Sequence, residues 1–133
     1  INTVELNKFD QIIIGASVKY GDHNKKIYDF IKNNKILLET KKTGFFSVNA
    51  TARKSEKNKP ETNPYVIKFL KKTKRTPDNI GVFAGKIDFP NYNFLEKYII
   101  KVIMWITNGP TDTSKTFEFT DWEDVKKFSD KIN

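Results

Sequence analysis

Three short segments of small and polar residues each follow an apolar run of strand-like composition. They are Gly15-Ala16-Ser17, Ser47-Val48-Asn49-Ala50 and Ala84-Gly85-Lys86. Parallel strands bring their carboxyl ends to one edge of a sheet, and ligands of open α/β sheets bind there. Small side chains also let a ligand approach the backbone closely. We therefore predict a shallow slot, lined by backbone N–H and C=O groups, that suits a planar heteroaromatic ring. The alternative is that small residues end strands in any α/β domain without binding a ligand.

Basic and hydroxyl-bearing side chains lie near these segments. Arg53 and Lys54 directly follow the second segment, where they would either pair with the carboxylates of a substrate or be solvated in a flexible loop. The stretch 107–114 is rich in hydroxyl groups and fits either contacts with a polar ligand or a helix cap and turn. His23 has no obvious charged partner, and we predict that it lies on the surface.

The composition argues against several kinds of chemistry. The 133-residue chain has no cysteine, which excludes disulfides, iron–sulfur ligation and thiol catalysis. Its single histidine argues against a metal site built from histidines, and no metal is predicted. Neither a Walker A nor a G-x-G-x-x-G motif occurs, so no triphosphate or dinucleotide site is predicted. No apolar run approaches the roughly 20 residues that a membrane-spanning helix needs.

The chain is strongly basic. Its net charge of +8 and its pI near 9.5 favour an anionic partner: a nucleic acid, an acidic lipid surface or a small anionic substrate. The other interpretation is that lysine is simply abundant along the whole chain.

Strand and helix patterns alternate, which predicts one α/β domain built from βαβ units. The run Ile12-Ile13-Ile14 favours a strand that is buried on both faces, as in a parallel sheet covered by helices. Thr120 is predicted to cap a closing helix, with Glu123 at the capping-box position. The predicted strands are 12–16, 45–48, 80–85 and 116–119, and the other predicted helices are 24–39, 64–72 and 94–107.

The helix predicted at 94–107 is unusually apolar, since Glu96, Lys97 and Lys101 are its only charged residues. Periodicity alone favours a core helix packed on the sheet. The alternative is a helix that contacts a membrane surface or a lipophilic substrate. The preceding stretch 90–93 is a connection long enough to act as a lid.

Separated blocks of this chain form a distinctive set. They are 9–21 (FDQIIIGASVKYG), 45–49 (FFSVN), 52–54 (ARK), 56–57 (EK), 84–85 (AG), 89–90 (FP), Tyr92, 100–101 (IK), 103–104 (IM), 111–113 (TDT) and 120–123 (TDWE). In this order they resemble the menaquinone-dependent protoporphyrinogen oxidases, which are flavodoxin-like FMN enzymes of haem biosynthesis. The resemblance extends from about residue 9 to the C-terminus.

The resemblance implies a single flavodoxin-like domain over 1–133, a three-layer α/β sandwich with a parallel sheet. The family's first strand, its phosphate-binding turn, its first helix and its second strand have no counterpart here. The expected domain is therefore partial at its N-terminus and holds the flavin-ring side of the FMN site. The apolar helix and the residues before it correspond to the insertion that separates these oxidases from simple flavodoxins, which favours a substrate or membrane contact for this helix.

The implied reaction is the oxidation of protoporphyrinogen IX to protoporphyrin IX, with electrons passed through FMN to a quinone, menaquinone or ubiquinone. No residue stands out as a general base, and the catalytic residues are unknown. The substrate-contact candidates are Lys19, Arg53, Lys54 and Lys86 for the propionates, and Tyr20 and Tyr92 for ring packing. The implied FMN-binding residues are Gly15, Ala16, Ser17, Val18, Tyr20, Ser47, Val48, Asn49, Ala50, Arg53, Gly85, Lys86, Asp112 and Thr113.

The implied partners are protoporphyrinogen IX, a membrane quinone and an acidic membrane surface, with the protein peripheral on the cytoplasmic side of the bacterial inner membrane. A nucleic acid is not expected, and assembly into a homo-oligomer is left open. Two other functions remain. One is a plain FMN electron carrier or quinone reductase, and the other is a non-enzymatic basic domain that binds nucleic acid or acidic lipid.

Overall fold

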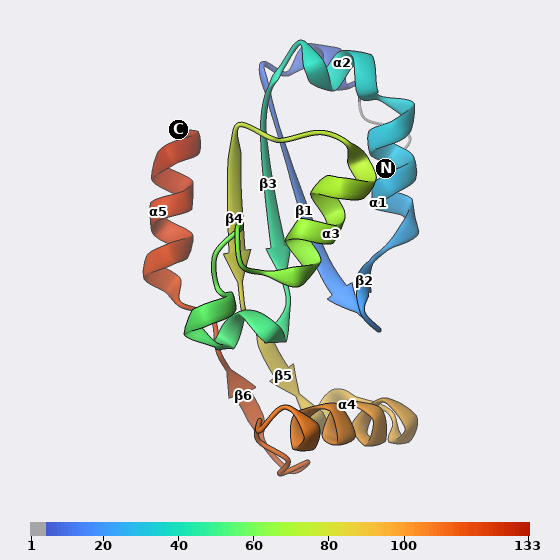
Figure 1. Cartoon of the computed structure of the whole chain (residues 1–133), viewed down its shortest axis with the longest axis vertical. Helices are drawn as coiled ribbons and strands as arrows, with labels where there is room; N and C mark the ends of the chain where they lie inside the picture. The colour runs from blue at the N-terminus through green and yellow to red at the C-terminus, as the bar shows by residue number, and fades with distance from the viewer. Residues whose placement is uncertain (1–4) are drawn as a thin grey trace.

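The computed structural model describes residues 5–133 as alternating strands and helices (Figure 1). The strands are β1 (Gln11–Lys19), β2 (Asp22–His23), β3 (Lys42–Val48), β4 (Asn79–Phe83), β5 (Lys86–Asp88) and β6 (Thr116–Glu118). The α-helices are α1 (Lys25–Asn33), α2 (Lys35–Glu39), α3 (Pro64–Thr73), α4 (Phe94–Ile106) and α5 (Trp122–Ile132). Short 3-10 helices are η1 (Leu6–Lys8), η2 (Ala50–Arg53), η3 (Ser55–Lys57) and η4 (Phe89–Asn91).

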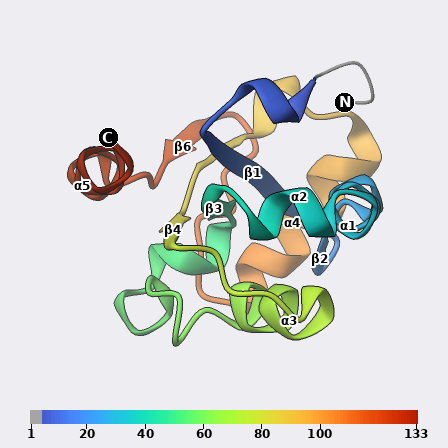
Figure 2. The same cartoon turned by 90° about the horizontal axis from the view of Figure 1, so that it is seen from above.

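The central sheet has the strand order β2-β1-β3-β4. Strands β1, β3 and β4 run parallel, and β2 is antiparallel to β1. Helices α1, α2 and α3 lie on one face of this sheet and α5 lies on the other (Figure 2). The three-layer α/β architecture with a parallel sheet, expected from the sequence, is confirmed.

The register of the parallel strands sets the level of their carboxyl ends. Ser17 pairs with Val48, and Val48 pairs with Phe83, so the three strands end at one edge. Strand β1 is longer than predicted and continues to Lys19. The segment Gly15-Ala16-Ser17 therefore lies inside the strand and not in a loop after it, because the ladder with β3 extends through these residues.

Strand β1 leads into a hairpin that the sequence analysis did not predict. Its two-residue turn, Tyr20-Gly21, has φ values of 54° and 84°. Positive φ at both central positions is the backbone of the tight turn that matches the twist of paired strands. The turn brings Asp22 and His23 back against Lys19 and Val18. It also holds the Tyr20 side chain out in solvent at the end of β1.

The two faces of β1 differ in burial. Ile12 and Ala16 are buried in the main core, whereas Ile13 on the opposite face is 42% exposed. The prediction of a strand buried on both faces is therefore wrong for residues 5–133. The reason is that α5 packs mainly against β4, where Phe128 contacts Phe83, and leaves Ile13 only partly covered.

The main core lies between the sheet and helices α1 to α3. Phe45 of β3 stacks on Phe69 of α3, with ring centroids 3.9 Å apart and planes 3° apart. Ile12, Ile31 and Leu38 complete this buried cluster. Helix α3 begins where Asn63 caps its first turn, and Pro64 occupies the first position, where the missing N–H costs nothing. Val66 and Phe69 are the buried residues of this helix.

Two helix boundaries differ from the prediction. Residues 24–39 form two helices, because the Asn34 side chain donates to the Phe30 carbonyl at 2.8 Å and ends α1. The cap of α5 is Asp121 and not Thr120: the Asp121 carboxylate accepts from the backbone N–H of Glu123 and of Asp124. An aspartate also suits the positive end of the helix dipole.

Residues 86–118 leave the sheet after β4 and return before α5. We call them the α4 module. Strand β6 does not join the main sheet as a fourth parallel strand. It pairs instead with β5 in a separate antiparallel ribbon, which carries α4 across the carboxyl edge of the sheet (Figure 1). Ile87, Phe89 and Met104 form a small core of the module, and Ala50 packs against it from the main body.

Candidate functional site

The carboxyl edge of the sheet brings together the second and third predicted segments and Ser17 of the first, whereas the predicted ligand contacts Gly15 and Ala16 lie further back inside β1. We call residues 17–21, 48–50 and 84–86 the rim. The backbone N–H of Asn49 donates to the Phe83 carbonyl at 2.9 Å, which joins the second segment to the end of β4, directly before the third segment. Ser47 and Asn49 are both buried, so their side chains support the rim from below. Backbone groups and the exposed side chains of Lys19, Tyr20 and Lys86 are what the rim offers a ligand.

A buried chain of polar side chains underlies the rim. His23 Nε2 lies 2.8 Å from Ser47 Oγ, which accepts a hydrogen bond from Asn49 Nδ2 at 3.0 Å. Asn63 Nδ2 donates to Asn49 Oδ1 at 2.9 Å, and the same Asn63 caps α3. His23 is only 4% exposed, so the prediction of a surface histidine is wrong. Its burial follows from the Tyr20-Gly21 hairpin, which turns it inward.

Charged side chains border this histidine on its outer side. The carboxylate of Asp22 accepts a hydrogen bond from Tyr28 Oη at 2.6 Å and pairs with Lys68 and Lys72 of α3. Burial alone would raise the pKa of Asp22, but the hydrogen bonds from Lys72, Tyr28 and Lys68 outweigh it and hold this pKa far below its ordinary value. Burial lowers the pKa of His23, so the imidazole stays neutral near pH 7.

Helix α4 is attached to the rim at both ends. Near its start, Lys19 Nζ lies 2.9 Å from Glu96 Oε1. This hydrogen bond raises the pKa of Lys19 and lowers that of Glu96. After its end, Arg53 Nη2 donates to the backbone oxygen and to Oγ1 of Thr107 at 3.0 and 2.9 Å, while Nη1 donates to the Ala50 carbonyl at 2.9 Å. Burial lowers the Arg53 pKa.

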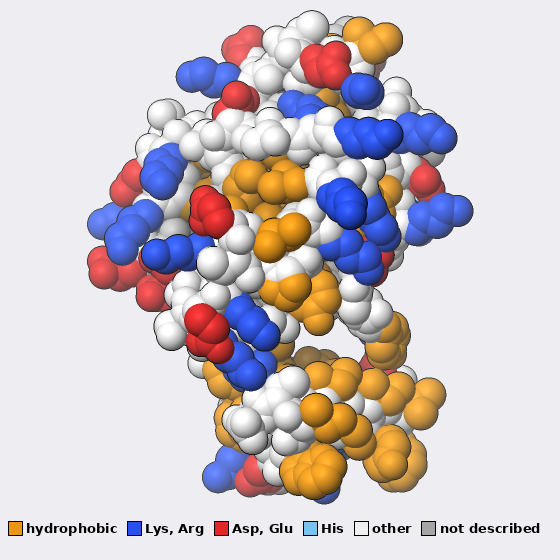
Figure 3. Space-filling view, viewed as in Figure 1, with side chains coloured by type: hydrophobic (Ala, Val, Ile, Leu, Met, Phe, Trp, Pro, Cys, Tyr) orange, Lys and Arg blue, Asp and Glu red, His pale blue; other side chains and the backbone are white. Residues whose placement is uncertain are grey.

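Both attachments lie on the same face of α4. Glu96 and Thr107 are separated by about three helical turns, so they project in nearly the same direction. Ile99 and Ile103 lie three and seven residues after Glu96, which places them on this same face. Figure 3 shows an opening between the main body and the α4 module. The rim and the Glu96–Ile103 face of α4 are therefore the two walls of the candidate site.

The other predicted residues are not all brought to these walls. Tyr92 packs in the core of the α4 module, where its hydroxyl accepts from the Asp88 N–H at 3.3 Å. Asp112 accepts from Ser114 N and Oγ within the loop after α4, with Thr113 beside it. No hydrogen bond in residues 5–133 joins Asp112 or Thr113 to the rim, and their roles stay predictions.

Lys54 and Lys86 stay near the rim without taking part in its internal contacts. Lys54 is partly buried and follows η2, and Lys86 is exposed at the start of β5. Neither side chain has an ion-pair partner within residues 5–133. Both therefore keep the ability to bind an anionic group. Glu96 and Asn63 were not predicted, and Thr107 was predicted only as part of the hydroxyl-rich stretch 107–114, although the capping-box pattern Asn93-x-x-Glu96 marks Glu96 as ordered.

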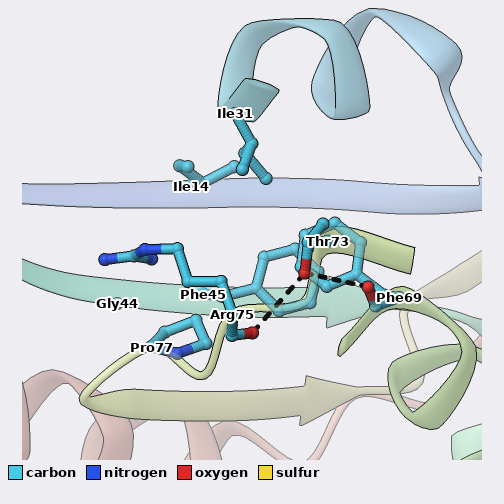
Figure 4. A pocket seen from close by; sticks show the side chains of 8 residues that line it. All are labelled: Ile14, Ile31, Gly44, Phe45, Phe69, Thr73, Arg75 and Pro77. Atoms are coloured by element: carbon cyan, nitrogen blue, oxygen red, sulfur yellow. Dashed lines mark hydrogen bonds between the residues drawn. The ribbon is translucent and has the colours of Figure 1, made fainter. Parts of the chain in front are cut away.

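A separate small pocket lies far from the rim, near the amino ends of β3 and β4 (Figure 4). Its walls come from α1, α3 and the sheet and include Ile31, Phe69 and Arg75. It encloses about 10 Å³, at the lower limit for one water molecule, so it is a packing gap and not a ligand site.

Substituting Gly85 by alanine tests how closely the rim is packed. Gly85 has φ +73°, and a Cβ there would lie 2.6 Å from Val48 Cγ1. We expect Gly85→Ala to lower the free energy of unfolding by about 2–3 kcal/mol, since backbone strain and overpacking add. Gly21→Ala is the matched control. Gly21 also has a positive φ, +84°, but a Cβ added there would have no atom within 4 Å. Its expected loss is about 1 kcal/mol. Equal losses in urea unfolding would contradict the contact with Val48.

Comparison with known proteins agrees with this geometry. The model of a family described as "Flavodoxin domain" matches residues 1–114. The chain is 38% identical over 132 residues to protoporphyrinogen IX dehydrogenase (quinone) of Escherichia coli K12, covering 99% of this chain and 73% of that protein. It is also 38% identical over 128 residues to the protein of the same name from Leishmania major, covering 96% of this chain and 55% of that protein. No solved structure matches the chain significantly. The chain therefore belongs to the flavodoxin domain family and, within it, to the quinone-dependent protoporphyrinogen IX dehydrogenases.

Proposed function

We propose that this protein oxidises protoporphyrinogen IX to protoporphyrin IX and passes the electrons through FMN to a quinone. The relatives' names support the substrate and the acceptor, and the flavodoxin domain supports FMN. The observation that carries the proposal is the attachment of α4 to the rim through Lys19–Glu96 and Arg53–Thr107. These contacts hold an apolar wall opposite a rim of backbone groups, which is the environment that a flat ring needs.

The residues at the rim fit the ring of FMN. Segments 17–20 and 48–50 and Gly85 would border the ring with backbone groups, and the positive φ of Tyr20 holds an aromatic side chain in solvent beside them. A non-glycine residue with positive φ is uncommon and is maintained at a cost, which favours a role in binding. FMN, when bound, would supply the two-electron chemistry that links the macrocycle to the quinone.

The remaining work of the protein is to bind and orient the porphyrinogen. Lys54 and Lys86 would pair with its propionates, because both lack an ion-pair partner within residues 5–133. Lys19 and Arg53 were also predicted for this role. Their contacts with Glu96 and Thr107 instead support a role in holding α4 at a fixed distance from the rim. Ile99 and Ile103 would exclude water from the reacting face.

The outward face of α4 suits an acidic membrane surface that supplies the quinone. Phe94, Tyr98 and Trp105 are 89%, 62% and 74% exposed and lie within one narrow sector of the helix. Lys97 and Lys101 lie along one border of this sector, where cations meet lipid headgroups. No helix within residues 5–133 could span a membrane. We therefore propose peripheral binding, on the cytoplasmic side of a bacterial inner membrane.

Anaerobic assay of the purified protein tests the proposal. We expect FMN to be taken up, and porphyrin fluorescence to rise only when protoporphyrinogen IX, FMN and the soluble quinone menadione are all present. Binding of FMN with quinone reduction but no porphyrin would favour a plain electron carrier or quinone reductase. Absence of FMN uptake, with nucleic-acid binding that collapses as salt rises, would replace the proposal by a basic binding domain.

A further inference from the structure

His23 is a buried titratable group that the proposed chemistry does not use. Its ring lies edge-on to Phe45 and Phe69, with centroids 5.6 and 5.2 Å away. Nε2 contacts Ser47 Oγ at 2.8 Å, while Nδ1 has no hydrogen-bond partner within residues 5–133. Burying an imidazole among aromatic rings costs free energy unless its nitrogens are hydrogen-bonded, so the contact with Ser47 is important for the stability of this arrangement.

The hydrogen bonds of Ser47 fix the direction of this contact. Asn49 Nδ2 donates to Ser47 Oγ, so the hydroxyl already accepts one bond and its own hydrogen needs an acceptor. His23 Nε2 is the acceptor within reach. If Nε2 instead carried the hydrogen, both the buried Ser47 hydroxyl hydrogen and the Nδ1 lone pair would lack partners. The arrangement with fewer unpaired groups has Ser47 donating to Nε2 and the ring hydrogen on Nδ1.

Burial lowers the pKa of His23 and favours this neutral form, and the charges of Lys68 and Lys72 act in the same direction while that of Asp22 acts against it. Asp22 lies beside it on β2, and the Asp22 carboxylate is contacted by Lys68 and Lys72 of α3 and by Tyr28 of α1. The negative charge of Asp22 is balanced by the two lysines, and its carboxylate also accepts the hydrogen bond from Tyr28. Protonating the ring would add an N–H on Nε2, which Ser47 Oγ could accept only if the Ser47 hydroxyl hydrogen pointed elsewhere, and Nδ1–H would still have no acceptor within residues 5–133.

The bond from Ser47 continues into the rim. Asn49 Oδ1 accepts from the backbone N–H of Ala52 at 3.2 Å and from Asn63 Nδ2 at 2.9 Å. The Asn49 side chain therefore helps to set the course of residues 48–52, and its own amide is oriented by Ser47 on one side and by Asn63 on the other. We propose that His23 is a positioning residue, which holds Ser47 and Asn49 so that segment 48–50 presents its backbone to the flavin ring. That the ligand is FMN rests on the proposed function, whereas the positioning of Ser47 and Asn49 by His23 rests on the hydrogen bonds alone.

Three variants test the proposal. In His23→Leu the acceptor is lost, and we expect the dissociation constant of FMN to rise about tenfold, as loss of one buried hydrogen bond implies. His23→Gln places an amide oxygen near the position of Nε2 and is expected to restore most of the affinity. Ile31→Val is the control, because Ile31 belongs to the same core cluster but is on α1, away from Ser47. It is expected to lower the melting temperature without changing FMN affinity.

The proposal is overturned if His23→Leu binds FMN as tightly as the unmodified protein. It is also overturned if Ile31→Val and His23→Leu lower the melting temperature by the same amount and weaken FMN binding by the same factor. A second measurement does not need the cofactor. Nitrogen NMR of His23 should show the hydrogen on Nδ1, and His23→Leu should speed amide exchange at Ala52 more than at Asn34, which caps α1 elsewhere. If the unmodified protein binds no FMN, the proposed function fails, and these two signals still decide the role of His23. A hydrogen on Nε2, or unchanged exchange at Ala52, would refute it.

Discussion

Replacing Phe94, Tyr98 and Trp105 together by serine will weaken binding to anionic lipid vesicles by about 100-fold. The three side chains occupy one exposed sector of α4. Each is expected to contribute about 1 kcal/mol when it is partly buried in a lipid surface, and about 1.4 kcal/mol corresponds to a factor of ten. Vesicle co-sedimentation measures the loss. Porphyrinogen oxidation with a soluble quinone should be retained, because the Glu96–Ile103 face of α4 is unchanged.

Ile36→Ser is the matched control for this experiment. Ile36 is 83% exposed on α2, so the change removes a large apolar side chain from a different surface. It is expected to leave vesicle binding within about twofold. Circular dichroism of the triple variant should confirm that α4 stays helical. Unchanged vesicle binding in a folded triple variant would refute the membrane role of α4 and favour substrate contact alone.

Phe69→Ala is expected to lower the free energy of unfolding by about 3–5 kcal/mol, as for other buried phenylalanines. Phe69 is 1% exposed, stacks on Phe45 and meets the His23 ring edge-on. Its loss removes these two ring contacts and the one with Tyr28, and opens a cavity between α3 and the sheet. Because a domain of this size has only about 5–15 kcal/mol of stability, this loss removes a large fraction of it. Urea unfolding measures the change.

The control lies on the same helix. Ile67 is 47% exposed, so Ile67→Ala removes apolar surface from α3 without emptying the core. It should cost less than about 1 kcal/mol. If Phe69→Ala cost no more than Ile67→Ala, the stacked pair of Phe45 and Phe69 would not be the centre of the core as described.

The sequence was sufficient to predict the parallel sheet and the common edge of its three strands. Apolar runs followed by small residues are local signals, and parallel pairing turned them into one rim. The Tyr20-Gly21 hairpin was missed because a tyrosine with positive φ is not a usual turn residue. With the hairpin missed, His23 could not be placed in the core. The break at Asn34 was missed because the apolar spacing continues across it.

The antiparallel ribbon and the exposure of α4 needed the tertiary structure. Strands of three residues, such as β5 and β6, carry too little pattern to show which strand they pair with. The apolar composition of α4 fitted a core helix equally well by periodicity, and the resemblance to the oxidases favoured a contact surface instead. The structure leaves Phe94 and Trp105 exposed, in agreement with the latter. Arg53 was predicted to bind the substrate. Its actual partner, the Thr107 carbonyl, is 54 residues away in the sequence, so no local pattern links the two.

The ribbon that carries α4 begins and ends at one point of the sheet, where Phe119 N donates to the Gly85 carbonyl at 2.9 Å. Because its two ends are in contact, the α4 module can be lengthened, shortened or replaced at little cost in conformational entropy and without shifting the strands of the main sheet. The length of the segment between Gly85 and Phe119 is therefore not fixed by the register of the parallel strands. Grafting residues 86–118 onto an unrelated scaffold at an equivalent junction tests this directly.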